Sequence, residues 1–322
     1  MLMSSVIDPI VLDTERFVDN SYSQNMERYL LGIIDNGLLV IDPSEKLKND
    51  LFSSADKLGQ SARGINSRIL LEEILKQGKK KIVKALPCHA PASQLQRMEY
   101  ACHIKNQCQT DMFLTCRDQI DQLQDKQDGN VVVMEDYTSF HPSETRRHRL
   151  ATSNFQVNKI DVAEFHKLLI GVIRFSKWIR FYDSQIGHGS GNLWSFREGI
   201  KLILTLYRDY GYFAQEPGMF IEIYTKQHVL DDLAFKRINS ELLVPLRILF
   251  PLWKIRLFIK DDPHSIFHAR FLESQNAIIS VDSGFDLFQT NGDLRTNFIR
   301  LDQDRTEHLE SCRKLKDLYK GT

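Results

Sequence analysis

The chain has 322 residues, of which 42% are hydrophobic and 26% are charged. This composition is typical of a globular protein with a sizeable core and excludes a disordered or fibrous chain. Lysine plus arginine and aspartate plus glutamate both total 42, so the formal charge is zero. Without an overall basic field, any contact with nucleic acid requires a local patch. The start has no basic segment followed by a long apolar one, and no apolar run could span a bilayer, so we expect a cytoplasmic protein with no membrane span.

The length predicts two domains, which we place at residues 1–150 and 151–322. Five cysteines make an odd number, and none stands in a CxxC motif. Reduced thiols are therefore favoured over a disulfide framework or a zinc site. The five are Cys88, Cys102, Cys108, Cys116 and Cys312.

The stretch from Pro9 to Val18 suggests the first candidate site. Its apolar run Ile10–Leu12 predicts a short buried parallel strand that stops at Asp13 and Thr14. Open α/β sheets bind ligands outside the carboxyl ends of their strands, so a carboxylate there could hold a hard cation. The alternative interpretation is that Asp13 caps the next helix. The residues of this stretch leave both interpretations open.

The sequence Ile-Val-Leu-Asp-Thr-Glu-Arg-Phe-Val resembles the opening strand of PIN-like nucleases, which are α/β domains whose acidic side chains hold magnesium or manganese. A second segment also follows the order of that family. A helix over 98–108 precedes Asp111, a strand ending in Leu114 and Thr115, and Asp118. Two residues separate Thr115 from Asp118 where the family commonly has one, and Glu99 is the only stand-in for the family's acid on the preceding helix.

The segment between these motifs carries the remaining predicted acid. We expect a helix through residues 26–33, a strand over 38–41 and a second helix from Ser44 that carries Asp50. By the resemblance Asp50 is the second acid, with Glu45 as its alternative, and a solvated helix face is the competing interpretation. The resemblance thus implies four catalytic residues, Asp13, Asp50, Asp111 and Asp118, of which Asp13, Asp111 and Asp118 would bind Mg²⁺ or Mn²⁺.

Three further segments complete the first domain. The basic run Lys76–Lys81 is either a phosphate contact or a solvated helix end. A last strand over Val131–Met134 leads into Glu135. The polar stretch 143–149 is a linker or a substrate-gripping arm, and we favour the linker.

The second half predicts a mixed sheet with helices. We expect helices over 162–175, 194–212 and 230–250, strands over 178–183, 219–225, 253–260, 267–272 and 277–281, and a charged C-terminal helix over 305–320.

Two motifs of the second half resemble phospholipase-D-type phosphodiesterases, which carry His-x-Lys on a strand, then Asp, then a Gly-Ser-x-Asn turn. His268 and Ser283 stand at the matching positions. The departures are Arg270 at the Lys position, Gln275 at the Asp position and Phe285 at the Asn position.

This variant resembles the phospholipase-D-like domain that ends the microtubule-interacting-and-trafficking (MIT) proteins, and its prokaryotic relatives. The shared features are Tyr-Asp, here Tyr182-Asp183, then His-x-Arg-Phe from His268 and Gly-Phe-Asp from Gly284. The resemblance implies that His268, Arg270, Ser283 and Asp183 bind phosphate or are an alternative catalytic set. The structural alternative is a histidine on a strand edge paired with Asp183 or Asp286.

These resemblances predict an α/β protein with a PIN-like parallel-sheet domain and a phospholipase-D-like mixed-sheet domain. The function that they imply is a metal-dependent nuclease acting on RNA or DNA, as effector of a prokaryotic toxin or anti-phage defence system. A homodimer or a multi-protein defence complex is the expected assembly. Two alternatives stay open: a histidine phosphodiesterase with an inert N-terminal domain, and a non-catalytic assembly module.

Overall fold

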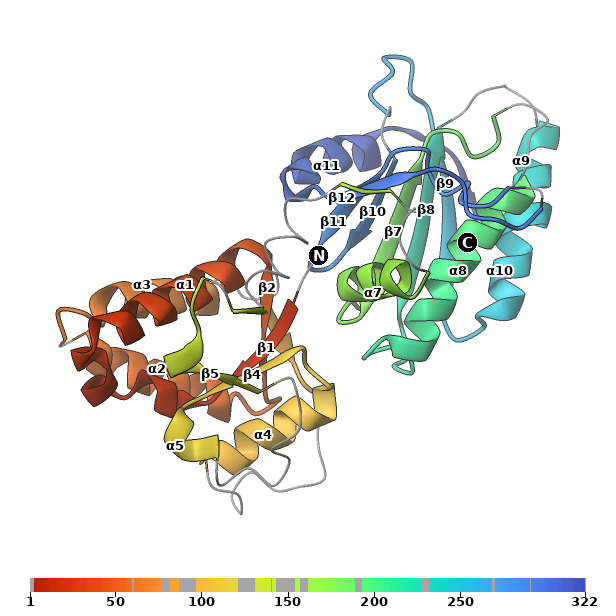
Figure 1. The fold of residues 1–322 in the computed structure, drawn as a ribbon. Coiled ribbons are helices and arrows are strands. Elements are labelled where there is room, and N and C mark those ends of the chain that lie inside the picture. Colours follow the sequence, from red (N-terminus) through yellow and green to blue (C-terminus); the bar gives the residue numbers. More distant parts are fainter. Residues whose placement is uncertain are drawn as a thin grey trace. The chain divides into compact units, whose positions relative to one another are not determined.

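The protein is described by a computed structural model over residues 3–59, 61–76, 81–86, 97–120, 131–139, 141–142, 154–156, 162–188, 193–226, 232–267, 270–289 and 291–321. The chain divides into two compact units, residues 2–150 and 151–322, each built around its own β-sheet (Figure 1). The α/β class is therefore confirmed, with one parallel and one mixed sheet. None of the helices in the described ranges combines the length and apolar character that crossing a bilayer requires.

The sheet of residues 2–150 has five strands, all parallel, in the order β3-β2-β1-β4-β5. The strands are β1 (Met3–Ile7), β2 (Gly37–Ile41), β3 (Ile82–Lys84), β4 (Met112–Thr115) and β5 (Val131–Val133). The helices are α1 (Asn20–Asn36), α2 (Lys46–Leu58), α3 (Ile65–Lys76), α4 (Arg97–Cys108) and α5 (Arg117–Ile120). All five residues of the central β1 are buried, as expected for a parallel strand with helices on both faces.

The first strand is not the one that the sequence predicts. Residues Pro9–Leu12 form the 3₁₀-helix η1, and the strand β1 precedes it at Met3–Ile7. The side chain of Asp8 accepts a hydrogen bond from the backbone N–H of Ile10, and Pro9 stands at the start of the turn, where its fixed φ suits a helix. A three-residue apolar run cannot by its pattern distinguish a buried helical turn from a strand.

The sheet of residues 151–322 has eight strands in the order β13-β9-β8-β7-β10-β11-β12-β6. Strands β7, β8 and β9 are mutually parallel, and the others join antiparallel. Their bounds are β6 (Phe155–Gln156), β7 (Trp178–Asp183), β8 (Phe220–Lys226), β9 (Lys254–Lys260), β10 (Arg270–Ser274), β11 (Ile278–Val281), β12 (Phe298–Leu301) and β13 (Asp317–Gly321).

The helices of this unit are α7 (Val162–Ile173), α8 (Leu193–Tyr210), α9 (Asp232–Ile238), the π-helical turn η6 (Asn239–Leu243), α10 (Val244–Leu249) and α11 (Thr306–Lys314). The predicted strand over 178–183 is confirmed. The predicted tail helix is wrong beyond Lys314, because the chain turns there and adds β13 to the sheet edge. The sequence does not predict strands β6 and β12. Both are short, and they are stabilised by pairing with strands that are distant in sequence.

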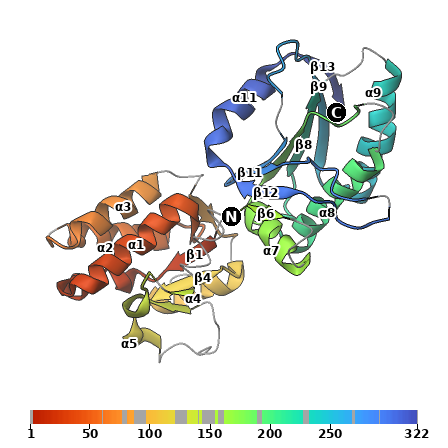
Figure 2. The ribbon, with the colours of Figure 1, turned by 45° about the horizontal axis from the view of Figure 1, so that its top comes forward.

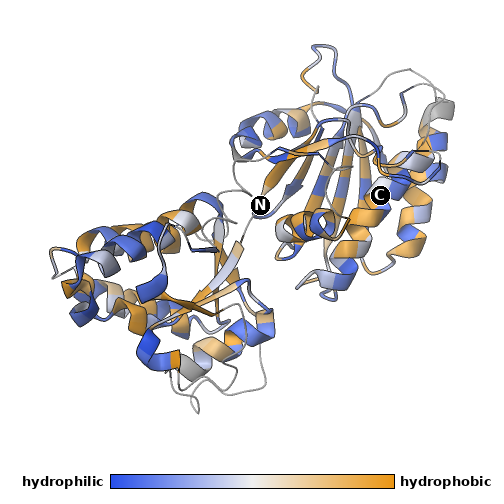
Figure 3. Cartoon of the chain, in the orientation of Figure 1, coloured by the Kyte–Doolittle hydropathy of each residue, from blue (hydrophilic) through white to orange (hydrophobic). Residues whose placement is uncertain are grey.

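Helices α8 and α11 lie on opposite sides of the second sheet (Figures 1 and 2). Beneath α11, the rings of Tyr182, Tyr224 and Phe258 stack across neighbouring strands at centroid distances of 4.9 and 4.8 Å. The apolar residues Leu309 and Cys312 of α11 close this cluster. Apolar and polar residues alternate along these strands, as the hydropathy colours of Figure 3 show. The aromatic stack therefore forms a second core on the α11 side of the sheet.

Candidate functional site

Two strands of the parallel sheet end in residues that contact each other, Asp8 after β1 and Thr115 at the end of β4. The Thr115 hydroxyl donates a 3.0 Å hydrogen bond to Asp8 Oδ2, and the backbone N–H of Asp8 donates to Leu114 O at 2.9 Å. Strands β1 and β4 are neighbours in the sheet. After β1 the chain adds β2 and β3 on one side, and after β4 it adds β5 on the other side, so the strand order reverses between β1 and β4. Open α/β sheets bind ligands at such a point. Burial raises the pKa of Asp8, and its hydrogen bonds from Ile10 and Thr115 oppose that shift.

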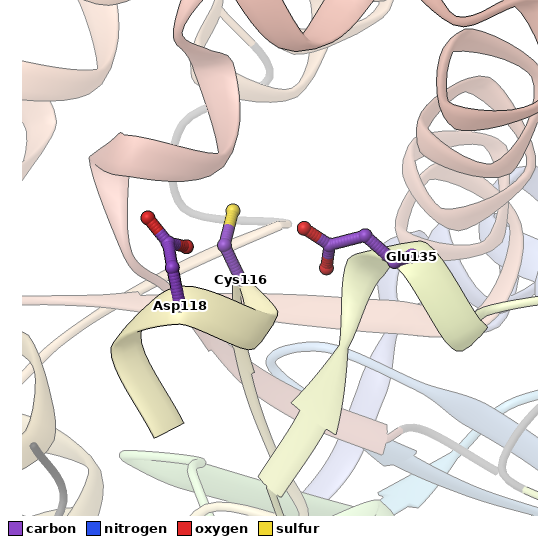
Figure 4. Close-up of side chains that lie close together, drawn as sticks. All are labelled: Cys116, Asp118 and Glu135. Atoms are coloured by element: carbon purple, nitrogen blue, oxygen red, sulfur yellow. The ribbon is translucent and has the colours of Figure 1, made fainter. Parts of the chain in front are cut away.

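Three further side chains converge at the ends of β4 and β5, and we call Cys116, Asp118 and Glu135 the edge cluster. Their potential ligand atoms all lie within 4.8 Å of one another. Figure 4 shows Cys116 and Asp118 reaching this space from the turn that begins α5, and Glu135 from η4 (Met134–Asp136). The side chains of Asp118 and Glu135 are 56% and 27% exposed, so solutes can reach both carboxylates.

The side chain of Arg16, in the 3₁₀-helix η2 (Thr14–Val18), contacts both carboxylates of the edge cluster. Its Nη2 donates to both carboxylate oxygens of Asp118 at 3.0 and 2.9 Å, and its Nη1 lies 3.4 Å from Glu135 Oε1. Burial opposes ionisation of Asp118, but the hydrogen bonds and charge of Arg16 outweigh it and hold the pKa of Asp118 below its usual value. The guanidinium group thus offsets the two negative charges that face each other here.

Cys116 is the third member of the edge cluster and is fully buried. Burial raises the pKa of its thiol to about 12, although a contact with Tyr22 at 3.4 Å and the charge of Arg16 act in the opposite direction. The thiol is therefore protonated at neutral pH. Hard cations prefer oxygen to sulfur ligands, so the two carboxylates are the groups of the edge cluster that suit Mg²⁺ or Mn²⁺.

The other predicted acids lie elsewhere. Asp13 follows η1, is exposed, and is close enough to Asp8 to act on its pKa, but it does not end a strand. Asp50 is half-buried within α2. Asp111 precedes β4, and its carboxylate accepts two 2.8 Å hydrogen bonds from Ser4 near the amino end of β1.

The prediction that Asp111 and Asp118 share one cation site is therefore wrong. Asp111 lies at the amino ends of the strands, whereas Asp118 lies at their carboxyl ends. Of the predicted ligands, only Asp118 belongs to the one group of metal-ligating side chains found among the described residues. Asp8, Glu135 and Arg16 also lie at this end of the sheet but are not among the site residues that the sequence predicts. Asp8 and Glu135 both follow an apolar strand, which is the signal that identifies them.

In the second unit, the predicted phosphate contacts Asp183 and Arg270 do come together. Arg270 at the start of β10 is paired with Asp183 at the end of β7, and Arg270 Nε lies 3.8 Å from Asp183 Oδ1. The backbone N–H of Phe285 donates to Asp183 Oδ2 at 2.8 Å, which holds the turn that contains Ser283 beside both. Ser283 itself is exposed and donates its backbone N–H to Asn297. His268 lies outside the described residues.

Asp183 is fully buried, and this raises its pKa to about 6 despite hydrogen bonds from Gln185 and Phe285 and the charge of Arg270. An acid whose pKa is raised by folding stabilises the fold fully below its unfolded pKa of 3.8, and this contribution is lost as the pH rises through about 6. We therefore expect the free energy of unfolding of wild type relative to Asp183→Asn to fall by up to about 3 kcal/mol between about pH 4 and about pH 7.

All three tryptophans, Trp178, Trp194 and Trp253, belong to residues 151–322, so urea unfolding followed by tryptophan fluorescence reports on this unit alone. A difference between wild type and Asp183→Asn that is the same at both pH values would contradict the prediction.

No protein-family model matches this chain, and no curated protein matches it either.

Proposed function

We propose that residues 2–150 form a metal-dependent phosphodiesterase that acts on RNA or DNA, with its site at the edge cluster. One observation carries the proposal: the carboxylates of Asp118 and Glu135 follow the adjacent parallel strands β4 and β5 and converge at the carboxyl end of the sheet, next to the β1–β4 pair at which the strand order reverses. Carboxylate oxygens are the preferred ligands of Mg²⁺ and Mn²⁺, and Mg²⁺ is commonly held by one or two carboxylates together with water and substrate phosphates.

The residues of the edge cluster fit such a cation. A positively charged group, the Arg16 guanidinium, already lies on both carboxylates, so the position favours positive charge. Asp118 and Glu135 would hold the divalent ion, which when bound stabilises negative charge on a phosphoryl oxygen. Arg16, released from the two carboxylates, would be placed to bind a phosphate of the substrate through paired N–H donors.

In this proposal residues 151–322 recognise phosphate through Arg270, which Asp183 orients. The pairing of a nuclease-like unit with a recognition unit suits an effector of a toxin or anti-phage defence system, working as a homodimer or within a larger complex. That role rests on the family resemblances described above.

The experiment compares cleavage of single- and double-stranded RNA and DNA with Mn²⁺, Mg²⁺ or EDTA. We expect wild-type cleavage to stop in EDTA and to fall by more than about a hundredfold in the double variant Asp118→Asn, Glu135→Gln, because both proposed cation ligands lose their charge. Asp136→Asn is the matched control, since this exposed neighbour of Glu135 pairs with Arg117 instead.

Two outcomes would contradict the proposal. Cleavage that continues in EDTA and survives the double variant would move the chemistry to residues 151–322. Absence of cleavage for every substrate and metal, with the protein folded, would favour a binding or assembly module.

A further inference from the structure

A cavity of about 390 Å³ lies over β10, β11 and β12 in residues 151–322. Phe271 faces Ser280 on the neighbouring strand and Ser280 faces Arg300 on the next, so these side chains lie on one face of the sheet. Asn154, just before β6, also lines the cavity, as do Arg270 and Phe298. Three neighbouring strands and the residue before a fourth, β6, thus contribute to the cavity wall.

Two arginines in this wall are held by fixed contacts. Arg270 Nη1 donates to the backbone oxygen of Asp282 at 2.5 Å, and its buried Nε has no hydrogen-bond acceptor among the described residues. Arg300 Nε donates to the Ser280 hydroxyl at 3.1 Å, while its Nη2 lies 3.6 Å from Asp302. A guanidinium group has five N–H donors, so these contacts orient both arginines and leave donors for the oxygens of an anion.

The remaining wall is suited to the body of a nucleotide. Phe298 is a large aromatic side chain on β12 that is 42% exposed, and aromatic faces stack with nucleobases of any sequence. Asp282 and Asn154 are exposed. A carboxylate can accept hydrogen bonds from sugar hydroxyls, and an amide side chain can both donate and accept them. The volume lies within the range of pockets that bind small molecules.

We propose that this cavity binds a nucleoside monophosphate, with its phosphate on Arg270 and Arg300 and its base on Phe298. The Asp282 carboxylate adds negative charge to the same cavity, which favours a monophosphate over a triphosphate. The ligand is either a free mononucleotide or the terminal nucleotide of a nucleic-acid strand. This site needs no metal and is independent of the chemistry proposed for residues 2–150, but it rests on the phosphate recognition by Arg270 proposed above for residues 151–322.

The test is calorimetric titration of the full chain, in EDTA, with AMP, GMP, CMP, UMP, ATP, inorganic phosphate and a short 5′-phosphorylated oligonucleotide. We expect Arg300→Gln to weaken monophosphate binding by about tenfold or more, because one charged hydrogen-bonding partner is lost. Phe298→Ala should weaken nucleotide binding about five- to hundredfold and leave phosphate binding unchanged. Arg208→Gln is the charge-matched control, since this exposed arginine pairs with Asp209.

Both test residues have exposed side chains, so their variants are expected to fold, which tryptophan fluorescence verifies. If the oligonucleotide binds more tightly than the mononucleotides, the ligand is the end of a nucleic-acid strand. If the mononucleotides bind more tightly, the ligand is a free nucleotide. Either result supports the proposal. No binding of any monophosphate up to about 5 mM, equal affinity for inorganic phosphate, or tighter binding of ATP would each overturn it. Because EDTA is present throughout, none of these outcomes depends on the metal site.

Discussion

Replacing Arg16 with glutamine should tighten Mn²⁺ binding at the edge cluster by about ten- to hundredfold. Arg16 now gives Asp118 and Glu135 the positive charge that a divalent ion would give them. A cation must displace these charge-assisted hydrogen bonds, which are worth about 1.5–3 kcal/mol. Glutamine removes the competing positive charge, so the two carboxylates face each other with no cation between them. A divalent ion that binds there then gains the electrostatic attraction that Arg16 provides in the wild type.

Mn²⁺ titration followed by electron paramagnetic resonance measures the affinity directly. Arg68→Gln is the matched control, because it removes the same charge from an arginine that pairs with Asp56 and Glu72 elsewhere in this unit. If Arg16 also binds the substrate phosphate, Arg16→Gln should cleave more slowly than wild type at saturating Mn²⁺. Unchanged or weaker Mn²⁺ binding in Arg16→Gln would show that the guanidinium does not compete for the cation position.

Replacing Gly199 with alanine should lower the free energy of unfolding of residues 151–322 by about 2–4 kcal/mol, the cost of overpacking a close contact. Gly199 lies in α8, and a Cβ there would be 2.0 Å from the backbone oxygen of Phe285 and 3.3 Å from Leu287 Cγ. The contact is with backbone, so rotation of a side chain cannot relieve it. The higher helix propensity of alanine, about 1 kcal/mol, offsets only part of this cost.

The effect should reach Asp183, because the backbone N–H of Phe285 donates to its carboxylate. Urea unfolding followed by tryptophan fluorescence measures the loss of stability. Thr205→Ala, a small change at a half-exposed position of the same helix, should alter the free energy of unfolding by no more than about 0.5 kcal/mol. Equal stability of Gly199→Ala and Thr205→Ala would contradict the close approach of α8 to the Phe285 turn.

Local pattern was sufficient for much of the secondary structure. The helix at Asn20–Asn36 and the strands at Gly37–Ile41 and Trp178–Asp183 are long or strongly apolar, so their periodicity predicts them. Pattern was insufficient where a short segment takes its form from distant partners. The apolar run Ile10–Leu12 predicts a strand but forms a helical turn between β1 and η2. Strand β13 forms because its backbone pairs with the edge of β9, far away in sequence.

The sequence by itself determined the α/β class, because hydrophobic periodicity is a local feature. Only the tertiary structure decided which acids meet. Parallel pairing of β1 with β4 places Asp111 beside Ser4 at one edge of the sheet and Asp118 at the other, although seven positions separate the two in sequence. Pairing of β4 with β5 brings Glu135 to Asp118, and η2 brings Arg16 onto both. Strand order and register are set by long-range burial, which no local pattern contains.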